Sequence, residues 1–402
     1  MTSVQDQGTQ DPAVLRAEMV SALRDMDAIT TDEVAAAVSA VPRHLFAPDE
    51  PLERVYDANT TLAPKTDANG DEVSVVSAAH IQAVMLEQTQ IEPGMNVLEV
   101  GSGGYNAALI AELVGAGSVT TVDIDPDIVA RARACLNAAG YDRVRTLRAD
   151  AEYGVREHAP YDRIIVTAAA WDIPPAWLDQ LSPHGKIVLP LRFAGLTRLV
   201  AFDHNDTGLV SHSYRLGAFV PMRGDGAFAD QLAPINGEVA FRIDCQQPAR
   251  FDVTGLRKAV HSPRIERWSG AAFDLPDELE LFLVTSASQV PMLHVSENLV
   301  EQGVFAAAAR RGVPVLVDGG SFAYRTKRAN EQVGGFESGV LAHGPEAEAL
   351  AARYVNLLRR WASDHRRRGA ARIVYVPNNM DTTGLSGWHA AKRYGLVAVT
   401  WS

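Results

Sequence analysis

The chain has 402 residues, a net charge of −12 and two cysteines. An acidic balance argues against nucleic acid as the main partner, because phosphate binding needs a basic surface. No apolar run approaches the roughly 18 residues that span a bilayer, and residues 1–12 lack the pattern of a secretory signal. Cys135 and Cys245 provide neither a disulfide framework nor a metal-binding spacing. We therefore expect a cytoplasmic protein with no metal, no membrane segment and two domains.

Apolar residues recur at helical spacing over residues 13–41, with a plausible helix start at Thr31-Asp32-Glu33. Further along, strand-like runs alternate with helical patterns. The expected strands are 96–100, 118–124, 144–149, 161–167 and 186–191, and the expected helices are 106–114, 126–139 and 175–181. Strands at 198–203 and 212–220 follow, joined by the turn Asn205-Asp206-Thr207-Gly208. This order predicts an α/β fold with a doubly wound, mostly parallel sheet and an antiparallel closing hairpin.

Residues 223–237 have the composition of a linker, and the pattern changes beyond them. The runs that look like strands are 238–244, 279–285, 313–317 and 372–376, and those that look like helices are 298–311 and 346–368. We expect a first domain over residues 1–225 and a C-terminal α+β domain over residues 238–402. Five arginines late in the last helical pattern indicate a solvated helix end, with a docking patch for an acidic peptide as the alternative.

The most informative segment is a buried strand that leads into a glycine turn and then a helix: Val97-Leu98-Glu99-Val100-Gly101-Ser102-Gly103-Gly104-Tyr105. The dinucleotide fingerprint needs a third glycine where this chain has Asn106. Gly101 and Gly103 permit a tight turn and a close approach of the backbone to a ligand. Glu99 would repel a pyrophosphate and attract an ammonium group. S-adenosylmethionine carries such an ammonium group together with its sulfonium.

Two further acids follow the next two strands of the predicted sheet. Asp123 lies where a carboxylate can accept both ribose hydroxyls, and Asp150 lies where it can accept from an adenine amino group. The carboxyl ends of parallel strands share one edge of the sheet, which is where such sheets bind ligands. A single acid there is often only a solvated loop residue. Three acids in register favour a cofactor that contains a nucleoside and an ammonium group.

The glycine turn, the three acids at the strand ends and the segments that flank them resemble the protein-L-isoaspartate O-methyltransferase family over residues 14–225. The segments that carry the resemblance are Ala40–Phe46, Val76–Ala83, Ala159–Ala170, Leu181–Lys186 and Phe219–Met222. The resemblance implies a Rossmann-like class I methyltransferase that uses S-adenosylmethionine and releases S-adenosylhomocysteine. The cofactor residues that it implies are Glu99, Gly101, Ser102, Gly103, Tyr105, Asp123, Ile124, Asp150, Ala151 and Thr167. The substrate residues that it implies are Ser77, Ala78, Ala169 and Trp171, with Ser77 and His80 as catalytic candidates.

The chain departs from the family pattern at several points. The glycine turn is one residue shorter, an unusual Asp67-Ala68-Asn69-Gly70-Asp71 segment precedes Ser77, and Ala79 and Gln82 replace a proline and a histidine. With the second domain, these departures resemble the branch of the family found in lanthipeptide, lasso peptide and graspetide pathways. The implied substrate is an ordinary aspartate in a ribosomally made precursor peptide, linear or already macrocyclised. Its methyl ester would close to a succinimide and hydrolyse to isoaspartate.

Several of these residues also have a plainer interpretation. Ser77 can hold a substrate carboxylate through one hydrogen bond, or it can cap the helix expected over residues 80–87. His80 can shape the pocket without acting on the substrate, and Trp171 can pack in the core. In the second domain, Trp388 and Trp401 are candidates for gripping the peptide, by position and family analogy alone.

Three other functions stay open at this point. A repair methyltransferase would prefer isoaspartyl peptides to aspartyl ones. A small-molecule O-methyltransferase would share the cofactor site but not the motif from Ser77 to Ala83. A non-enzymatic adaptor would keep the fold without binding S-adenosylmethionine, and the acids at 99, 123 and 150 argue against it.

Overall fold

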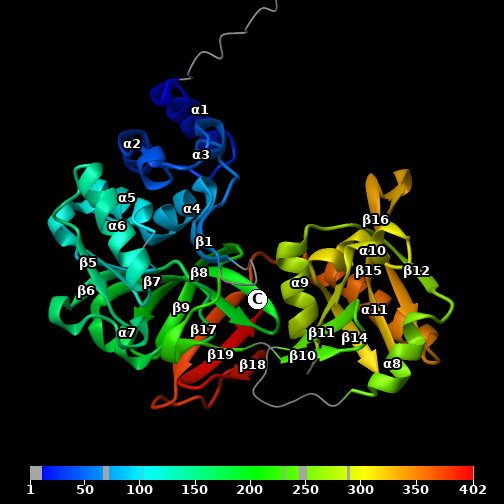
Figure 1. Cartoon of the computed structure of the whole chain (residues 1–402). Helices are drawn as coiled ribbons and strands as arrows, with labels where there is room; N and C mark the ends of the chain where they lie inside the picture. Colours follow the sequence, from blue (N-terminus) through cyan, green and yellow to red (C-terminus); the bar gives the residue numbers. More distant parts are fainter. Residues whose placement is uncertain are drawn as a thin grey trace, which may run out of the picture. The chain divides into compact units, whose positions relative to one another are not determined.

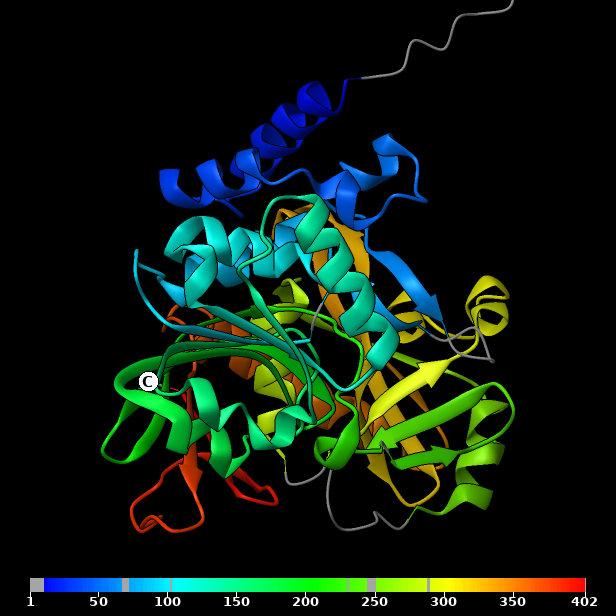
Figure 2. The same cartoon turned by 60° about the vertical axis from the view of Figure 1, so that its left-hand side comes forward.

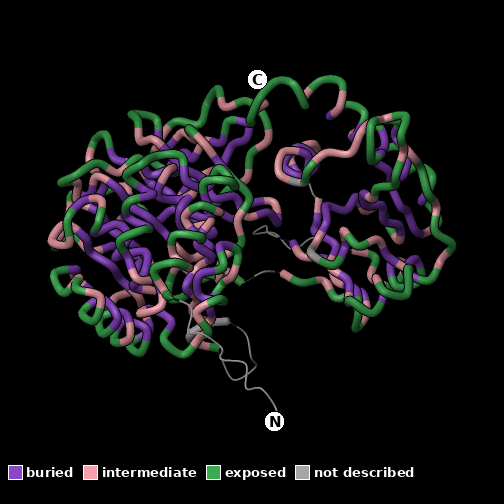
Figure 3. Tube along the Cα trace, turned by 90° about the horizontal axis from the view of Figure 1, so that it is seen from above, coloured by how far each residue is buried: buried purple, intermediate pink, exposed green. Residues whose placement is uncertain are grey.

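The computed structural model describes residues 11–66, 72–101, 103–229, 231–243, 251–287 and 290–401. The chain divides into two compact units. Unit 1 comprises residues 1–191 and 198–228, and unit 2 comprises residues 192–197 and 229–402. Buried residues gather inside each unit (Figure 3). The expected domain boundaries, 1–225 and 238–402, stay a prediction, and the expected Asp67–Asp71 turn, Ser102 and Cys245 lie outside the described residues.

Unit 1 begins with helices that precede its main sheet. In chain order the elements are α1 (Pro12–Asp25), α2 (Asp32–Ala40), the 3-10 turn η1 (Arg43–Phe46), α3 (Leu52–Val55), the hairpin strands β1 (Leu62–Thr66) and β2 (Glu72–Val76), and α4 (Ala79–Thr89). Asp11 caps α1 ahead of Pro12, and Thr31 caps α2 by accepting from the Val34 amide. Both caps agree with the helix signals in the sequence.

The main sheet of unit 1 has the strand order β9-β8-β7-β6-β3-β4-β5 (Figure 1). The strands are β3 (Val97–Val100), β4 (Val119–Asp123), β5 (Arg145–Arg148), β6 (Tyr161–Val166), β7 (Leu181–Phe193), β8 (Leu196–Asn205) and β9 (Gly208–Leu216). Between them lie α5 (Tyr105–Val114), η2 (Ala116–Ser118), α6 (Pro126–Ala138), η3 (Ala151–Tyr153), η4 (Arg156–His158) and α7 (Pro175–Gln180), and η5 (Gly224–Gly226) follows β9.

Strand β3 is central and pairs in parallel with both β4 and β6, while β8 and β9 pair antiparallel. The expected α/β fold, a doubly wound sheet with a closing hairpin, is therefore confirmed. All four residues of β3 are buried, as helices on both sides of a parallel sheet require. Helices α4, α5 and α6 lie on one side of the sheet and α7 on the other (Figures 1 and 2). The carboxyl ends of β3, β4 and β6 meet at one edge.

Unit 2 contains an antiparallel sheet of order β10-β11-β13-β14-β15-β16-β12. Its strands are β10 (Gln231–Pro234), β11 (Val239–Ile243), β12 (Ile265–Ala272), β13 (Met292–Val295), β14 (Val313–Asp318), β15 (Ser321–Asn330) and β16 (Gly335–His343). Strands β17 (Arg372–Pro377), β18 (Trp388–Ala391) and β19 (Gly395–Thr400) form a ladder of order β18-β19-β17. The helical elements are α8 (Val253–Val260), α9 (Pro276–Thr285), α10 (Glu297–Glu301), η6 (Ala307–Arg311), η7 (Glu331–Val333), α11 (Ala347–Arg360) and the π turn η8 (Trp361–His365).

Several sequence expectations were wrong in detail, mostly in unit 2. The strand expected at 279–285 is part of helix α9, whose start carries a proline and two acids in the first turn. The helix expected over 298–311 is two short helices, α10 and η6. The helix expected to run to residue 368 leaves α-geometry after Arg360. The supposed linker 223–237 contains η5 and β10, and the strand expected at 212–220 is β9, which ends at Leu216.

Within the described residues, no helix is both long enough and apolar enough to cross a membrane.

His343 is a buried titratable group in the sheet of unit 2. Its ring stacks on Phe322, with 4.8 Å between ring centroids, and burial lowers its pKa to about 4. An unfolded histidine has a pKa near about 6.5, so the unfolded chain binds one more proton between these pH values. Unit 2 should therefore lose stability as the pH falls from about 6.5 towards 4, by about 3 kcal/mol for this group.

Replacing His343 by phenylalanine should reduce the loss of stability between neutral and acidic pH. Phenylalanine keeps a ring that can stack on Phe322 but has no group that takes up a proton. The free energy of unfolding of parent and variant can be measured by urea denaturation at pH 7 and at pH 4.5. An unchanged difference between the two pH values would mean that His343 does not titrate as its burial implies.

Candidate active site

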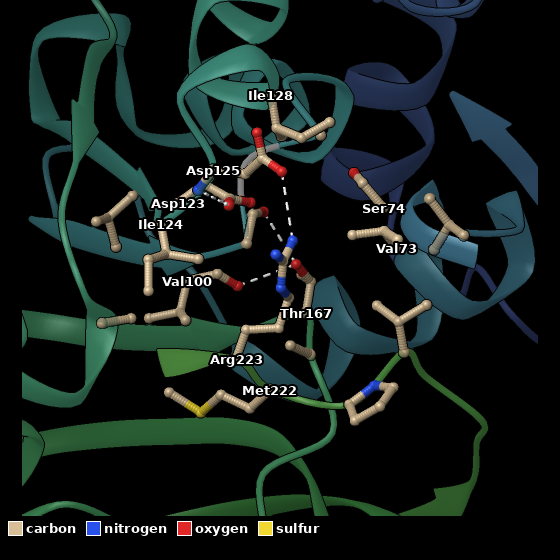
Figure 4. Close-up of a pocket in the computed structure, with 18 residues that line it drawn as sticks. Val73, Ser74, Val100, Asp123, Ile124, Asp125, Ile128, Thr167, Met222 and Arg223 are labelled. Atoms are coloured by element: carbon tan, nitrogen blue, oxygen red, sulfur yellow. Dashed lines mark hydrogen bonds and ion pairs between the residues drawn. The ribbon is translucent and has the colours of Figure 1, made fainter. Parts of the chain in front are cut away.

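A cavity of about 640 Å³ lies at the carboxyl edge of the sheet in unit 1 (Figure 4). Its wall is made by β2, the ends of β3, β4 and β6, the start of α6 and residues 220–223. Six residues that the sequence assigned to the cofactor line it: Gly101, Gly103, Asp123, Ile124, Ala151 and Thr167.

The glycine turn is held from the end of β6. Gly101 has a φ of +99°, and a Cβ there would lie 2.4 Å from the Thr167 hydroxyl oxygen. That hydroxyl is 3.0 Å from the carbonyl oxygens of Val100 and Gly101 and donates to them. The close approach explains why a residue without a side chain is required here. The turn therefore presents bare backbone to the cavity.

Glu99 lies beneath the glycine turn and is fully buried. One carboxylate oxygen accepts from the Thr121 hydroxyl at 2.6 Å, and the other has no hydrogen-bond partner within the described residues. Burial raises the pKa of Glu99 to about 7, while the Thr121 hydroxyl and the nearby Asn106 side chain oppose the rise. Glu99 is not part of the cavity wall, so its contact with an ammonium group stays a prediction.

Tyr105 does not reach the cavity. Its ring is buried, with the Arg43 guanidinium 4.7 Å from its centroid and the Phe46 ring at 5.6 Å. The structure thus gives Tyr105 a packing position behind the turn, as the first residue of α5, and Gly104, whose φ is +82°, is the cap residue before it.

Asp123 is accompanied by a second acid that the sequence reading did not single out. An Asp123 oxygen accepts from the Asp125 amide at 2.9 Å, and Asp125 caps α6. The Lys65 ammonium lies 2.8 Å from Asp125 and lowers the pKa of that carboxyl. Arg223 reaches towards Asp125 from below the cavity, at 3.3 Å (Figure 4). The sequence Asp125-Pro126 is typical of a helix start and could have identified Asp125 as a cap. Lys65 and Arg223 are distant in sequence, and no local pattern indicates that they pair with Asp125.

Asp150 is not part of the cavity wall, although its neighbour Ala151 is. One Asp150 oxygen accepts from the Glu152 amide at 3.0 Å, and the other accepts from the Asp225 amide at 2.8 Å. Tyr153 donates a further hydrogen bond to the Asp225 carboxylate. Asp150 therefore anchors the segment after β9 beside the cavity.

A second cavity of about 1140 Å³ adjoins the first, and the two share Val75, Val220 and Pro221 in their walls. Ser77 and Ala78, which the sequence assigned to the substrate, line this second cavity. The two cavities therefore lie side by side at these residues. We refer to them as the cofactor cavity and the substrate cavity.

Ser77 is held in place through its backbone carbonyl, and its side chain does not cap helix α4. The cap position of α4 is Ala78, and no side chain caps this helix. The Ser77 carbonyl accepts from Arg43 at 2.8 Å, and Arg43 also donates to the Val55 carbonyl and the Gln82 side chain. The sequence alternative, that Ser77 caps the helix, is not what the structure contains.

The other expected substrate residues lie away from the wall of the substrate cavity. The His80 ring nitrogen Nδ1 donates to the Ala58 carbonyl at 3.0 Å. Ala169 is buried and exchanges backbone hydrogen bonds with Val220 and Met222. Trp171 is buried and stacks on Phe228 with 4.1 Å between centroids. His80 and Ala169 thus support segments that line the cavities, and Trp171 is a packing residue.

The described residues contain no cluster of three or more histidine, cysteine or acidic side chains that could hold a metal ion.

Replacing Glu99 by glutamine tests its predicted role towards the cofactor. Glu99 ionises as the pH rises through about 7, so affinity for S-adenosylhomocysteine, which carries the same ammonium, should rise between pH 6 and 8. The variant should bind about tenfold more weakly at pH 8 and lose this pH dependence, as calorimetry can measure.

The same variant should be more stable than the parent at pH 8. A carboxyl whose folded pKa is raised loses stability as the pH climbs above the unfolded value, and glutamine removes that penalty. Weaker stability with unchanged ligand affinity would contradict the assignment.

The chain matches known proteins in agreement with this geometry. The model of the family described as Protein-L-isoaspartate(D-aspartate) O-methyltransferase (PCMT) matches residues 15–226. The Protein-L-isoaspartate O-methyltransferase of Methanopyrus kandleri is 38% identical over 219 residues, which are 54% of this chain and 94% of the relative. That of Methanococcoides burtonii is 40% identical over 211 residues, covering 51% of this chain and 100% of the relative.

One solved structure extends over both units. It is described as a protein-L-isoaspartate O-methyltransferase, has a TM-score of 0.52 and 19% identity, and covers 96% of this chain and 99% of its own. At that identity it shows the fold alone. The chain belongs to the protein-L-isoaspartate O-methyltransferase family and is an S-adenosylmethionine-dependent protein carboxyl O-methyltransferase.

Proposed function

We propose that the enzyme methylates an aspartate-derived carboxylate in a peptide segment that enters the substrate cavity. The observation that carries the proposal is the junction of the two cavities at Val75, Val220 and Pro221, with Ser77 in the substrate cavity. The cofactor residues that we propose are Gly101, Gly103, Asp123, Ile124, Ala151 and Thr167 at the cavity wall, and Glu99 beneath it. Asp150 and Tyr105 support them from behind.

The methyl transfer needs little acid–base catalysis from the protein. A carboxyl with a pKa of about 4 is already ionised at neutral pH, so no strong general base is needed. S-adenosylmethionine supplies an activated methyl group, which passes from sulfur to a carboxylate oxygen and leaves S-adenosylhomocysteine. We assign Ser77 to hold the carboxylate in line with that methyl group, and the apolar cavity wall to exclude water.

The first candidate substrate is an isoaspartyl residue, as named for the relatives at 38–40% identity. The methoxy group of its methyl ester leaves more readily than an oxygen of the ionised carboxylate. The next backbone amide nitrogen therefore attacks the ester carbonyl, methanol departs and a succinimide forms. Hydrolysis of that ring then gives aspartate and isoaspartate. The enzyme is required for the first step alone.

The second candidate is the aspartate of a ribosomally made precursor peptide, which the departures at Ala79 and in the glycine turn favour. The structure and the comparisons weaken two of the sequence arguments for a precursor peptide as the substrate. Gln82 is an internal acceptor for Arg43, so its identity bears on packing more than on the substrate. The fold of unit 2 also matches a structure described as a protein-L-isoaspartate O-methyltransferase, so it does not by itself indicate peptide tailoring.

Two versions of one peptide, with aspartate and with isoaspartate at the same position, separate the candidates. Preference for the isoaspartyl version by at least about 100-fold in kcat/KM is expected for repair. Methylation is measured by transfer of label from S-adenosylmethionine. Preference for the aspartyl version favours precursor modification, and methylation of neither by enzyme that binds S-adenosylhomocysteine would refute the proposal.

We further propose that unit 2 contributes to binding the peptide through Trp388 and Trp401. Support comes from a cavity of about 980 Å³ in unit 2, lined by both tryptophans and by residues 285–287. Aromatic side chains offer large contact area at low entropic cost.

Replacing Trp388 by alanine should raise KM for the peptide about tenfold, with kcat and the affinity for S-adenosylhomocysteine unchanged. Trp268, which Arg328 covers elsewhere in the sheet of unit 2, is the matched control. A KM for the Trp388 variant equal to that of the control would remove Trp388 from the proposed surface.

A further inference from the structure

Thr61 and Ser77 lie next to the terminal residue pair of the hairpin β1–β2. The two strands pair antiparallel, and the register includes Leu62 opposite Val76. Thr61 precedes Leu62 and Ser77 follows Val76, so extending this register by one step would set Thr61 opposite Ser77 at the open end of the hairpin. Residues opposite each other on an antiparallel pair have Cβ atoms about 5 Å apart and point to the same face. Both residues line the substrate cavity.

Thr61 has no evident structural reason to be a threonine. It is exposed, lies just before β1 and belongs to neither a helix cap nor the hydrophobic core of unit 1. A residue whose side chain is not needed for packing, yet which faces a cavity beside Ser77, is a candidate for contact with the ligand.

The apolar wall of the substrate cavity favours a second donor. Apart from Thr61 and Ser77, the described residues that line the substrate cavity are apolar. A carboxylate has two oxygens, and a serine hydroxyl donates one hydrogen bond. A carboxylate taken from water into such a wall with a single donor would be poorly compensated. Thr61 offers the second hydroxyl.

We propose that Thr61 and Ser77 form a hydroxyl pair that holds the substrate carboxylate, each donating one hydrogen bond. This inference rests on the proposed function of the substrate cavity. A neutral pair suits the reaction, because it orients the carboxylate without cancelling its charge as a lysine or arginine ion pair would. The attacking oxygen keeps a lone pair for the sulfonium methyl group.

The test compares Thr61→Val, which keeps the shape and removes the hydroxyl, with Thr61→Ser, which keeps the hydroxyl. For the better of the aspartyl and isoaspartyl peptides, Thr61→Val should lower kcat/KM about tenfold, as for one hydrogen bond to a charged group. Thr61→Ser should stay within about twofold of the parent. Calorimetry should give both variants the parent affinity for S-adenosylhomocysteine, since Thr61 lines only the substrate cavity of the two.

Ser77→Ala and the double variant complete the experiment. If both hydroxyls hold one carboxylate, their effects should be coupled and not simply add. Parent kinetics for Thr61→Val beside a loss for Ser77→Ala would overturn the role of Thr61 and leave the proposed function standing. Equal losses for Thr61→Val and Thr61→Ser would also overturn it, because the hydroxyl would not be the cause. Parent kinetics for both Thr61→Val and Ser77→Ala would overturn the assignment of the substrate cavity itself.

Discussion

The site depends most on the contacts that the buried guanidinium of Arg43 makes. A charge taken out of water must find partners, and Arg43 finds three: the carbonyl oxygens of Val55 and Ser77 and the side chain of Gln82. It also lies over the ring of Tyr105. One side chain thereby joins the N-terminal segment, the end of β2, helix α4 and the start of α5.

These contacts explain how the two cavities come to share a wall. Fixing the Ser77 carbonyl fixes the end of β2, and Val75 in that strand lines both cavities. On the opposite side, backbone bonds between Ala169 and residues 220 and 222 fix the other shared wall, and Asp150 holds the segment that follows. Asp125 and Arg223, which pair with each other, are part of the wall of the cofactor cavity, and Lys65 pairs with Asp125 from outside that wall. Arg43, Gln82, Asp150 and Ala169 thus help to build the site without lining either cavity.

Six of the residues assigned to the cofactor line the cofactor cavity, whereas two of those assigned to the substrate line the substrate cavity. Gly101, Asp123 and Thr167 lie at strand ends, so their meeting at one edge follows from the parallel sheet. Lys65, Arg223 and Thr61 could not be found in that way, because their positions depend on hairpin register and on a segment without regular structure. For Trp171 the sequence allowed either a channel residue or core packing, and in the structure the side chain is buried against Phe228.

By itself, the sequence determined the β-α alternation, the glycine turn and the acids at strand ends of unit 1, since these are local patterns of spacing and turn chemistry. It did not determine the antiparallel sheet of unit 2, where short apolar runs such as 279–285 suit a strand or a buried helix equally. Tertiary structure alone decided which polar groups are satisfied internally and which face a cavity. Asp150 and Gln82 belong to the first kind and Ser77 and Thr61 to the second, because the choice depends on partners that are distant in the chain.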